Sequence, residues 1–277
     1  MTYPQGDTTR RSDAGEGRVP PQPKGLGRSA SPRVVARRSR TPASTPRSSR
    51  LARLAAQPSA RRERFGGALL WRLYAILDHA AAGGRDLAWL AQQAIAGGAD
   101  VLQLRHKDAS TRDLLSDVAR VRPIAKAAGI PLIINDRADV ALAGDADGVH
   151  VGQDDLPVSA VRRLGPTHWI VGKSTHSFEQ AMAAANEPVD YIALGPIYAT
   201  PTKPNSPHVG LEVIPRVTQA VRKPVVVIGG IDHQTLPEVL RAGARCAAVV
   251  RAICAADDPE EAARRLKSAM AAIPGRW

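Results

Sequence analysis

The sequence predicts one α/β domain, a closed (β/α)8 TIM barrel, preceded by a disordered basic tail. Residues 1–66 are rich in Arg, Ser, Pro and Gly, whereas apolar segments of regular spacing begin only after them. From Trp71 onward, eight short apolar runs alternate with eight helical segments over about 200 residues. This repeat number and span are typical of a barrel. An open doubly wound sheet is the alternative.

The eight predicted strands are short runs of Val, Ile, Leu, Ala and Tyr, as expected for strands buried on both faces. They span Leu73–Leu77, Val101–Leu104, Leu132–Ile134, Gly148–Val151, Trp169–Val171, Tyr191–Leu194, Val225–Ile228 and Ala247–Val250. The first run leads into Leu-Asp-His and lacks the G-x-G-x-x-G phosphate fingerprint that a doubly wound sheet carries there. The closed barrel is therefore the better prediction.

Each predicted strand is followed by a segment with helical periodicity, often bounded by Gly or Pro. Gly97 and Gly129 end the first two, and Pro157 suits a first helical turn. The predicted helices span Asp86–Ala96, Thr111–Ala128, Ala138–Ala143, Pro157–Leu164, Phe178–Ala185, Leu211–Val221, Thr235–Ala242 and Pro259–Ala272.

The formal charge of +12 belongs to the tail. Residues 1–66 hold 15 Lys and Arg against 4 Asp and Glu, and residues 67–277 hold 23 against 22. We therefore divide the chain into a disordered extension, 1–66, and a barrel domain, 67–277. Three explanations of the extension stay open: a non-functional segment from an upstream start, a targeting peptide, or a nucleic-acid-binding arm.

The two cysteines, Cys246 and Cys254, have no metal-type spacing, and Cys246 begins an apolar run. We expect reduced, buried thiols and a cytoplasmic setting. No apolar run approaches the ~20 residues that a membrane-spanning helix needs.

Polar residues follow the predicted strands, at the barrel face where active sites lie. After the second strand, Gln103, Arg105 and Lys107 alternate and can all point inward, where Arg and Lys suit a phosphate. A structural ion-pair network is the alternative. Asp136 and Asp155 follow the third and fourth strands, and two carboxylates with substrate phosphates suit Mg²⁺. They could instead be helix N-caps.

A second anion site is predicted from the later strands. Thr200, Thr202 and Lys203 follow the sixth strand at Gly195-Pro196, although a solvated surface loop is the alternative. Of these, Lys203 is grouped with Arg105, Lys107 and a metal in the first anion site. Gly229-Gly230 and the Val250–Arg251 backbone follow the seventh and eighth strands, where barrels often bind a phosphate. Ser174 adds a hydroxyl after the fifth strand.

These segments together resemble one enzyme family. From about Arg72 to Ala272 the chain is similar to thiamine-phosphate synthases, in motifs of the same order and separation: QLRHK, IND, DGVHVGQDD, GKSTH, GPIYATPTK and IGGI. The resemblance implies joining 4-amino-2-methyl-5-pyrimidinylmethyl diphosphate to a thiazole phosphate, with release of pyrophosphate and formation of thiamine monophosphate. It implies small-molecule substrates, one Mg²⁺ per subunit and no protein nucleophile, and it leaves the oligomeric state open.

The resemblance also assigns residues. The pyrimidine diphosphate would bind Gln103, Leu104, Arg105, His106, Lys107, Asn135, Ser174 and Lys203, of which Arg105, Lys107, Ser174 and Lys203 would act on the leaving group. The thiazole phosphate would bind Thr200, Pro201, Thr202, Gly230, Val250 and Arg251, and Mg²⁺ would bind Asp136 and Asp155. At 251 the family commonly has Ser, so the role of the Arg251 side chain is open.

Two other functions are alternatives to thiamine-phosphate synthesis. A thiazole tautomerase is a related barrel that needs only the thiazole phosphate site, and QLRHK, Asp136, Asp155 and Lys203 argue against it. A nucleic-acid-binding role would rest entirely on residues 1–66.

Overall fold

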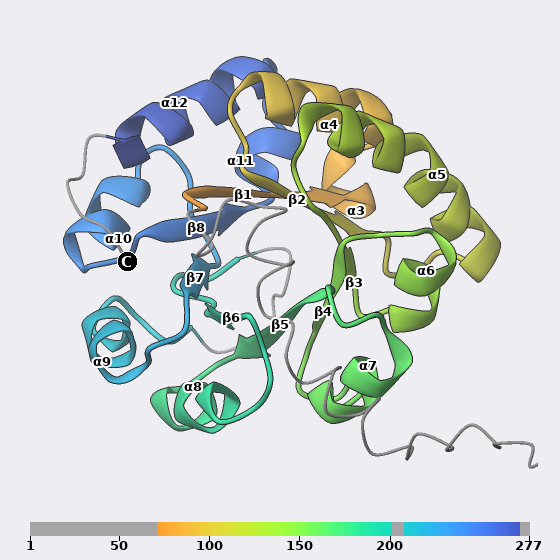
Figure 1. Ribbon diagram of the computed structural model, residues 1–277. Coiled ribbons are helices and arrows are strands. Elements are labelled where there is room, and N and C mark those ends of the chain that lie inside the picture. Colours follow the sequence, from red (N-terminus) through yellow and green to blue (C-terminus); the bar gives the residue numbers. More distant parts are fainter. Residues whose placement is uncertain (1–70, 201–207, 272–277) are drawn as a thin grey trace, which may run out of the picture. The chain divides into compact units, whose positions relative to one another are not determined.

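A computed structural model describes residues 71–200 and 208–271 of the chain. Eight parallel strands pair in sequence order, and β1 also pairs with β8, which closes the barrel (Figure 1). The strands are β1 Leu73–Asp78, β2 Val101–Arg105, β3 Leu132–Asn135, β4 Gly148–Val151, β5 Ile170–Thr175, β6 Tyr191–Leu194, β7 Val225–Ile228 and β8 Cys246–Val249. The predicted closed barrel is confirmed, and the open sheet is excluded.

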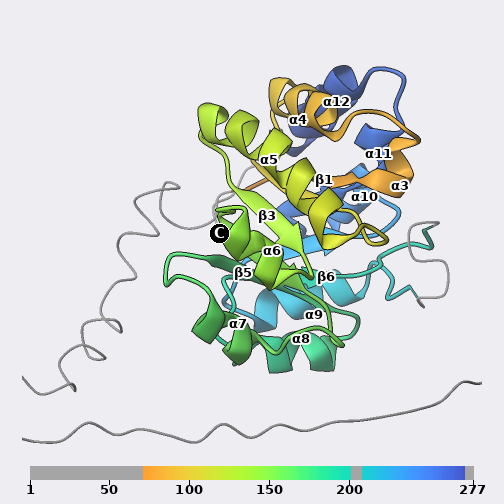
Figure 2. The ribbon, with the colours of Figure 1, turned by 90° about the vertical axis from the view of Figure 1, so that its right-hand side faces the viewer.

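Helices surround the strands, as Figures 1 and 2 show from two directions. They are α3 His79–Ala82, α4 Leu87–Ala96, α5 Thr111–Ala128, α6 Ala138–Ala143, α7 Val158–Leu164, α8 Phe178–Ala185, α9 Val213–Ala220, α10 Leu236–Arg241, α11 Arg251–Cys254 and α12 Pro259–Ala271. Serine hydroxyls cap α5 and α8: Ser110 accepts from the Asp113 amide and Ser177 from the Gln180 amide.

The structure differs from the predicted elements at a few places. The four-residue helices α3 and α11 were not predicted, because one turn is too short to show a periodic pattern. Strand β5 continues to Thr175, four residues beyond its predicted end. Pro157 precedes α7 with extended backbone and is not in its first turn. The predicted domain boundary between residues 66 and 67 lies outside the described residues.

Alternation along the strands divides the core into two layers. Leu73, Ala75 and Leu77 of β1 face the helices, whereas Tyr74 and Ile76 face the barrel interior. The interior cluster consists of Trp71, Tyr74, Ile76, Val101, Ile133, Ile170, Tyr191, Val226, Cys246 and Ala248. Its two tyrosines bring hydroxyl groups into an otherwise apolar layer.

Three aspartates stabilise the amino-terminal end of the barrel. Asp100, Asp147 and Asp190 each precede an even-numbered strand and accept a hydrogen bond from a backbone amide in or next to the preceding odd-numbered strand. Each also pairs with a cation, Lys267, Arg122 and Arg162 respectively. The three side chains connect strands to one another and to the outer helices, on the face opposite the predicted site.

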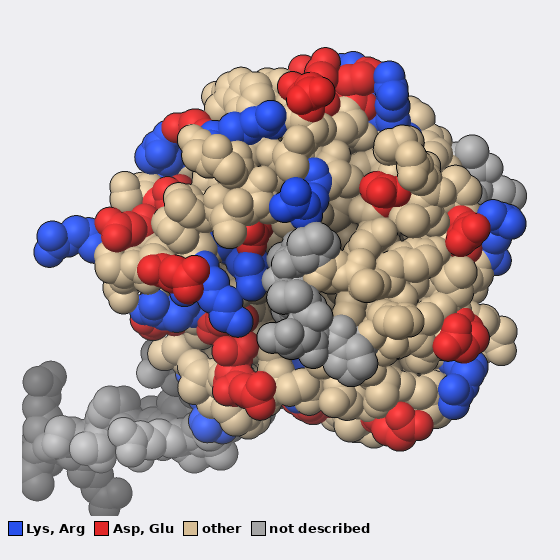
Figure 3. All heavy atoms as spheres, turned by 180° about the vertical axis from the view of Figure 1, so that it is seen from behind, with Lys and Arg blue, Asp and Glu red and all other residues tan. Residues whose placement is uncertain are grey.

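The described surface carries both signs of charge. Figure 3 shows acidic and basic side chains interspersed around one face, with no single basic patch among the residues coloured there. This agrees with the near balance of charge in residues 67–277. None of the helices within the described ranges is long and apolar enough to cross a membrane.

Candidate active site

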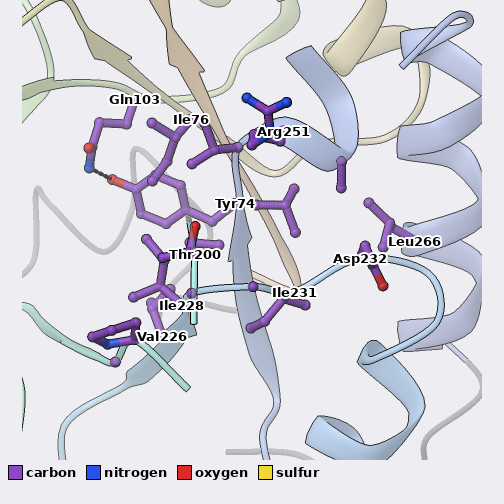
Figure 4. Close-up of a pocket in the computed structure, with 18 of the residues that line it drawn as sticks. Tyr74, Ile76, Gln103, Thr200, Val226, Ile228, Ile231, Asp232, Arg251 and Leu266 are labelled. Atoms are coloured by element: carbon purple, nitrogen blue, oxygen red, sulfur yellow. Dashed lines mark hydrogen bonds between the residues drawn. The ribbon is translucent and has the colours of Figure 1, made fainter. Parts of the chain in front are cut away.

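A pocket of about 950 Å³ opens at the carboxyl ends of the strands. Eight residues predicted to bind substrates line it: Gln103, Arg105, Asn135, Ser174, Thr200, Gly230, Val250 and Arg251. They come from β2, β3 and β5 and from the segments that follow β6, β7 and β8. Figure 4 shows several of them around the apolar side chains Ile76, Val226 and Ile228. The structure therefore brings residues of both predicted anion sites into one cavity.

Gln103 and Arg105 point into the barrel from alternate positions of β2, as predicted. Gln103 is buried, and its side-chain amide donates to the hydroxyl of Tyr74 at 2.8 Å (Figure 4). Arg105 forms an ion pair with Asp78, at the end of the neighbouring strand β1. Asp78 is 2% exposed and also caps α3 by accepting from the Ala81 amide. Arg105 therefore takes part in an ion pair, as the structural alternative predicted, and this pair holds the Arg105 guanidinium at the pocket.

Asp136 and Asp155 lie beside each other although they follow different strands. The pKa of Asp136 is raised to about 6, first by burial, then by its hydrogen bond with Asp155 and by the negative charge of that residue. The charges of Lys107 and Arg105 oppose this rise, so both cations lie near the carboxylates. Lys107 itself is exposed beyond the end of β2.

The helix-cap alternative for these two aspartates is excluded. Helix α6 begins after Arg137 and α7 after Pro157, and neither helix has a side-chain cap. Asp155 instead accepts from the Gly152 amide at 2.7 Å. Asp136 has φ of 61°, a left-handed conformation that is unusual outside glycine and is often found at functional sites.

The donor set at this pair fits a hard divalent cation. Two carboxylates in contact repel one another, and the raised pKa of Asp136 reports that repulsion together with burial. A cation that takes oxygen ligands would relieve it. Within the described residues no cluster of three or more His, Cys, Asp and Glu side chains has ligand geometry. Two carboxylates are a sufficient protein donor set for Mg²⁺, which keeps waters and uses substrate phosphates as further ligands.

Two residues of the QLRHK segment turn away from the pocket. Leu104 is fully buried in the layer between the strands and the helices. The His106 imidazole lies 2.8 Å from Asp117 of α5 and stacks on His79, with ring centroids 3.7 Å apart. If these two residues bind the diphosphate as predicted, they do so through the backbone.

The predicted second anion site includes two glycines with left-handed backbone. Gly229 and Gly230 have φ of 103° and 66°, which only glycine adopts readily. A Cβ at Gly230 would lie 2.6 Å from the Cβ of Tyr198, so the segment after β7 packs closely against the segment after β6. Val250 and Arg251 continue the same wall of the pocket. Pro201 and Thr202, which are also predicted for this site, and Lys203, which is predicted for the diphosphate site, lie outside the described residues.

The sequence did not reveal a chain of hydrogen-bonded polar side chains that line the inner part of the pocket. The Tyr74 hydroxyl lies 2.8 Å from that of Tyr191, which lies 2.9 Å from Nδ1 of His150. Nε2 of His150 lies 2.8 Å from the Ser174 hydroxyl. Burial raises the pKa of Tyr74 and Tyr191, so both stay protonated. The signal that could have revealed them is two tyrosines at inward-facing strand positions, because a buried hydroxyl requires a partner.

The cysteines take no part in this site. Cys246 and Cys254 are unpaired and buried, which confirms the prediction. Burial raises the pKa of Cys254 to about 11 and also raises that of Cys246, so neither is a thiolate nucleophile near neutral pH.

Comparison with known proteins identifies the family. The family model for thiamine monophosphate synthase matches residues 73–253. A thiamine-phosphate synthase of Chloroflexus aurantiacus is 46% identical over 199 residues, which cover 72% of this chain and 92% of the relative. One from Mycolicibacterium vanbaalenii is 48% identical over 198 residues, covering 68% and 89%.

A solved structure is similar over the same region. Thiamine phosphate pyrophosphorylase from Pyrococcus furiosus superposes with a TM-score of 0.68 at 31% identity, covering 76% of this chain and 98% of that protein. The sequence resemblance, the barrel and the pocket are therefore consistent with one another. The chain belongs to the thiamine monophosphate synthase family.

Proposed function

We propose that this chain joins 4-amino-2-methyl-5-pyrimidinylmethyl diphosphate to a thiazole phosphate, releasing pyrophosphate and forming thiamine monophosphate. The bond from the pyrimidine methylene to the diphosphate oxygen breaks, and its electrons leave with pyrophosphate. The pyrimidine amino group donates electrons to the methylene left behind. The thiazole nitrogen then supplies the pair for the new C–N bond, so no protein nucleophile is required.

On the diphosphate side, the chemistry requires positive charge where pyrophosphate departs. Arg105 is held at the pocket by Asp78, and Lys107 lies near the Asp136 carboxylate. Ser174 offers a hydroxyl from the end of β5, and Asn135 an amide from the end of β3. We assign Arg105, Lys107, Ser174 and Lys203 to stabilise the leaving group electrostatically, which requires donors that are placed before the reaction begins.

Asp136 and Asp155 are assigned as the ligands of one Mg²⁺ per subunit. When bound, the ion would supply further positive charge to the diphosphate oxygens. The chain's own contribution is to hold the two carboxylates together. Asp136 is fixed by a 2.7 Å hydrogen bond from its amide to the His150 carbonyl, and Asp155 by the Gly152 amide.

The observation that carries this proposal is that one pocket is lined at once by Arg105 and Ser174 and by Gly230, Val250 and Arg251. Two phosphorylated substrates that react with each other must lie in one cavity. A thiazole tautomerase would use only the Gly230 side and would leave the Asp136–Asp155 pair and its cations without a role. We place the reaction in the cytoplasm, where reduced thiols such as Cys246 and Cys254 persist.

The direct test is to incubate the full chain with both substrates and Mg²⁺ and to measure thiamine phosphate and pyrophosphate. We expect equal amounts of the two products and no turnover after chelation of the metal. Isomerisation of a thiazole carboxylate phosphate without formation of thiamine phosphate would favour the tautomerase instead.

A further inference from the structure

Five polar side chains that line the pocket form one continuous hydrogen-bonded path. It runs from Gln103 on β2 through Tyr74 on β1 and Tyr191 on β6 to His150 on β4 and Ser174 on β5. Successive donor and acceptor atoms are 2.8, 2.8, 2.9 and 2.8 Å apart. All five side chains line the pocket, and the two at the ends of the path, Gln103 and Ser174, are assigned to the diphosphate substrate.

The step between Tyr191 and His150 crosses a whole strand. Both residues are register partners of Gly172 on β5, which lies between their strands. A Cβ at Gly172 would lie 2.1 Å from Cζ of Tyr191 and 2.5 Å from Nδ1 of His150. Gly172 does not have a positive φ, so its backbone conformation does not demand glycine. The missing side chain is what lets the tyrosine hydroxyl reach the imidazole.

The donors along this path have one consistent direction. Among the described residues Tyr74 has two hydrogen-bond partners, Gln103 and Tyr191, and it accepts from the Gln103 amide. Tyr74 therefore donates its single hydroxyl proton to Tyr191, and Tyr191 donates its own hydroxyl proton to Nδ1 of His150. A neutral imidazole that accepts at Nδ1 carries its proton at Nε2 and donates it to Ser174. The proton of the Ser174 hydroxyl is then free to point into the pocket.

We propose that Tyr191 and Tyr74 are positioning residues that fix the Nε2-protonated form of His150 and thereby direct the Ser174 hydroxyl as a donor toward the departing diphosphate. In this role they act through His150 and Ser174. The inference deepens the proposed function, and its kinetic part rests on that function. Its structural part, the tautomer of His150, does not.

The tautomer can be measured directly by ¹⁵N NMR of the histidine side chains. The signals of His150 are identified by their absence in His150→Gln. In the unmodified chain we expect a protonated Nε2 and an unprotonated Nδ1. In Tyr191→Phe, which keeps the ring and removes only the hydroxyl, we expect a mixture of tautomers or the opposite one. A proton on Nδ1 in the unmodified chain, or spectra unchanged in Tyr191→Phe, would overturn the proposal.

The kinetic test is a double-mutant cycle between Tyr191→Phe and Ser174→Ala. We expect Tyr191→Phe to lower kcat about tenfold, as for loss of one oriented donor, with less than about twofold change in either KM. In the Ser174→Ala background the same change should alter kcat by less than about twofold, because Tyr191 acts through that hydroxyl. Equal losses in both backgrounds would contradict the path.

The matched control is Cys246→Ala, which also removes one buried heavy atom from the interior cluster that contains Tyr191. It should lower the melting temperature comparably but leave kcat and the His150 spectrum unchanged. Tyr74→Phe interrupts the path one step earlier and provides a second variant should Tyr191→Phe fold poorly. We expect it to shift the His150 signals in the same direction. If the unmodified chain made no thiamine phosphate, the proposed function would fail, whereas the NMR result would still decide this inference.

Discussion

Replacing Asp136 with Asn should stabilise the metal-free protein while removing its activity. Asp136 has a pKa of about 6 in the folded chain, against an ordinary value of 3.8. Each pH unit is worth 1.36 kcal/mol, so ionised Asp136 costs the fold at most about 3 kcal/mol. Because the carboxyl is partly exposed, solvent screening reduces this, and we expect Asp136→Asn to gain about 1 to 2 kcal/mol.

The sign follows from proton binding. Between about pH 4 and pH 6 the folded chain retains a proton that the unfolded chain releases, so stability falls as pH rises through this window. Above about pH 6 the full cost is present. In Asp136→Asn this part of the pH dependence should disappear.

Urea unfolding of the full chain in EDTA at pH 7.5 and at pH 4.5 measures the effect. The control is Asp139→Asn on α6, where an exposed pair with Arg137 lowers the pKa of the carboxyl. That variant should be unchanged or slightly less stable, by at most about 1 kcal/mol. Added Mg²⁺ should stabilise the unmodified chain and not Asp136→Asn. A metal-free Asp136→Asn protein less stable than the unmodified chain at pH 7.5 would refute the electrostatic account of the pair.

Three further outcomes are expected. Lys203→Ala should lower the rate of bond cleavage by about 10²-fold or more, which is the loss typical of one preorganised charge. Thr200→Val should mainly raise the KM for the thiazole substrate about tenfold, because it loses ~1.5 kcal/mol of hydrogen bonding. Steady-state kinetics that vary each substrate separately check this, and exchanged effects would contradict the two-site assignment. Asp147→Ala should destabilise the fold by about 3–5 kcal/mol, because it removes the buried carboxylate that pairs with Arg122 and leaves that side chain with Asp145 alone; an unchanged urea midpoint would show that the pair contributes little. Deleting residues 1–66 should leave melting temperature and turnover nearly unchanged, and loss of salt-sensitive RNA binding on deletion would instead support the nucleic-acid arm.

Local patterns in the sequence were sufficient to predict most of the barrel. Thr111–Ala128, Ala138–Ala143 and Phe178–Ala185 form helices with the predicted bounds, because apolar periodicity and the residues that end a helix act within a few residues. The eight strands were recognisable as apolar runs between these helices. Fold-level rules then placed the strand ends, and with them Gln103 and Asn135, at one face.

The remaining features depend on contacts between distant segments. Tyr74 and Tyr191 look like ordinary apolar strand residues, and only barrel closure brings their hydroxyls together. Gly172 must lack a side chain because a Cβ there would collide with side chains of the two neighbouring strands. His106 could have pointed either way, and its contact with Asp117 on α5 determined the direction.

The most direct test of the two-substrate pocket is a crystal structure of the full chain with Mg²⁺, pyrophosphate and thiamine phosphate. We expect the metal about 2.1 Å from carboxylate oxygens of both Asp136 and Asp155. Pyrophosphate should contact the metal, Arg105 and Ser174, and the phosphate of thiamine phosphate should contact the Gly230 backbone. A metal bound away from the two aspartates, or pyrophosphate bound at Gly230, would contradict the account.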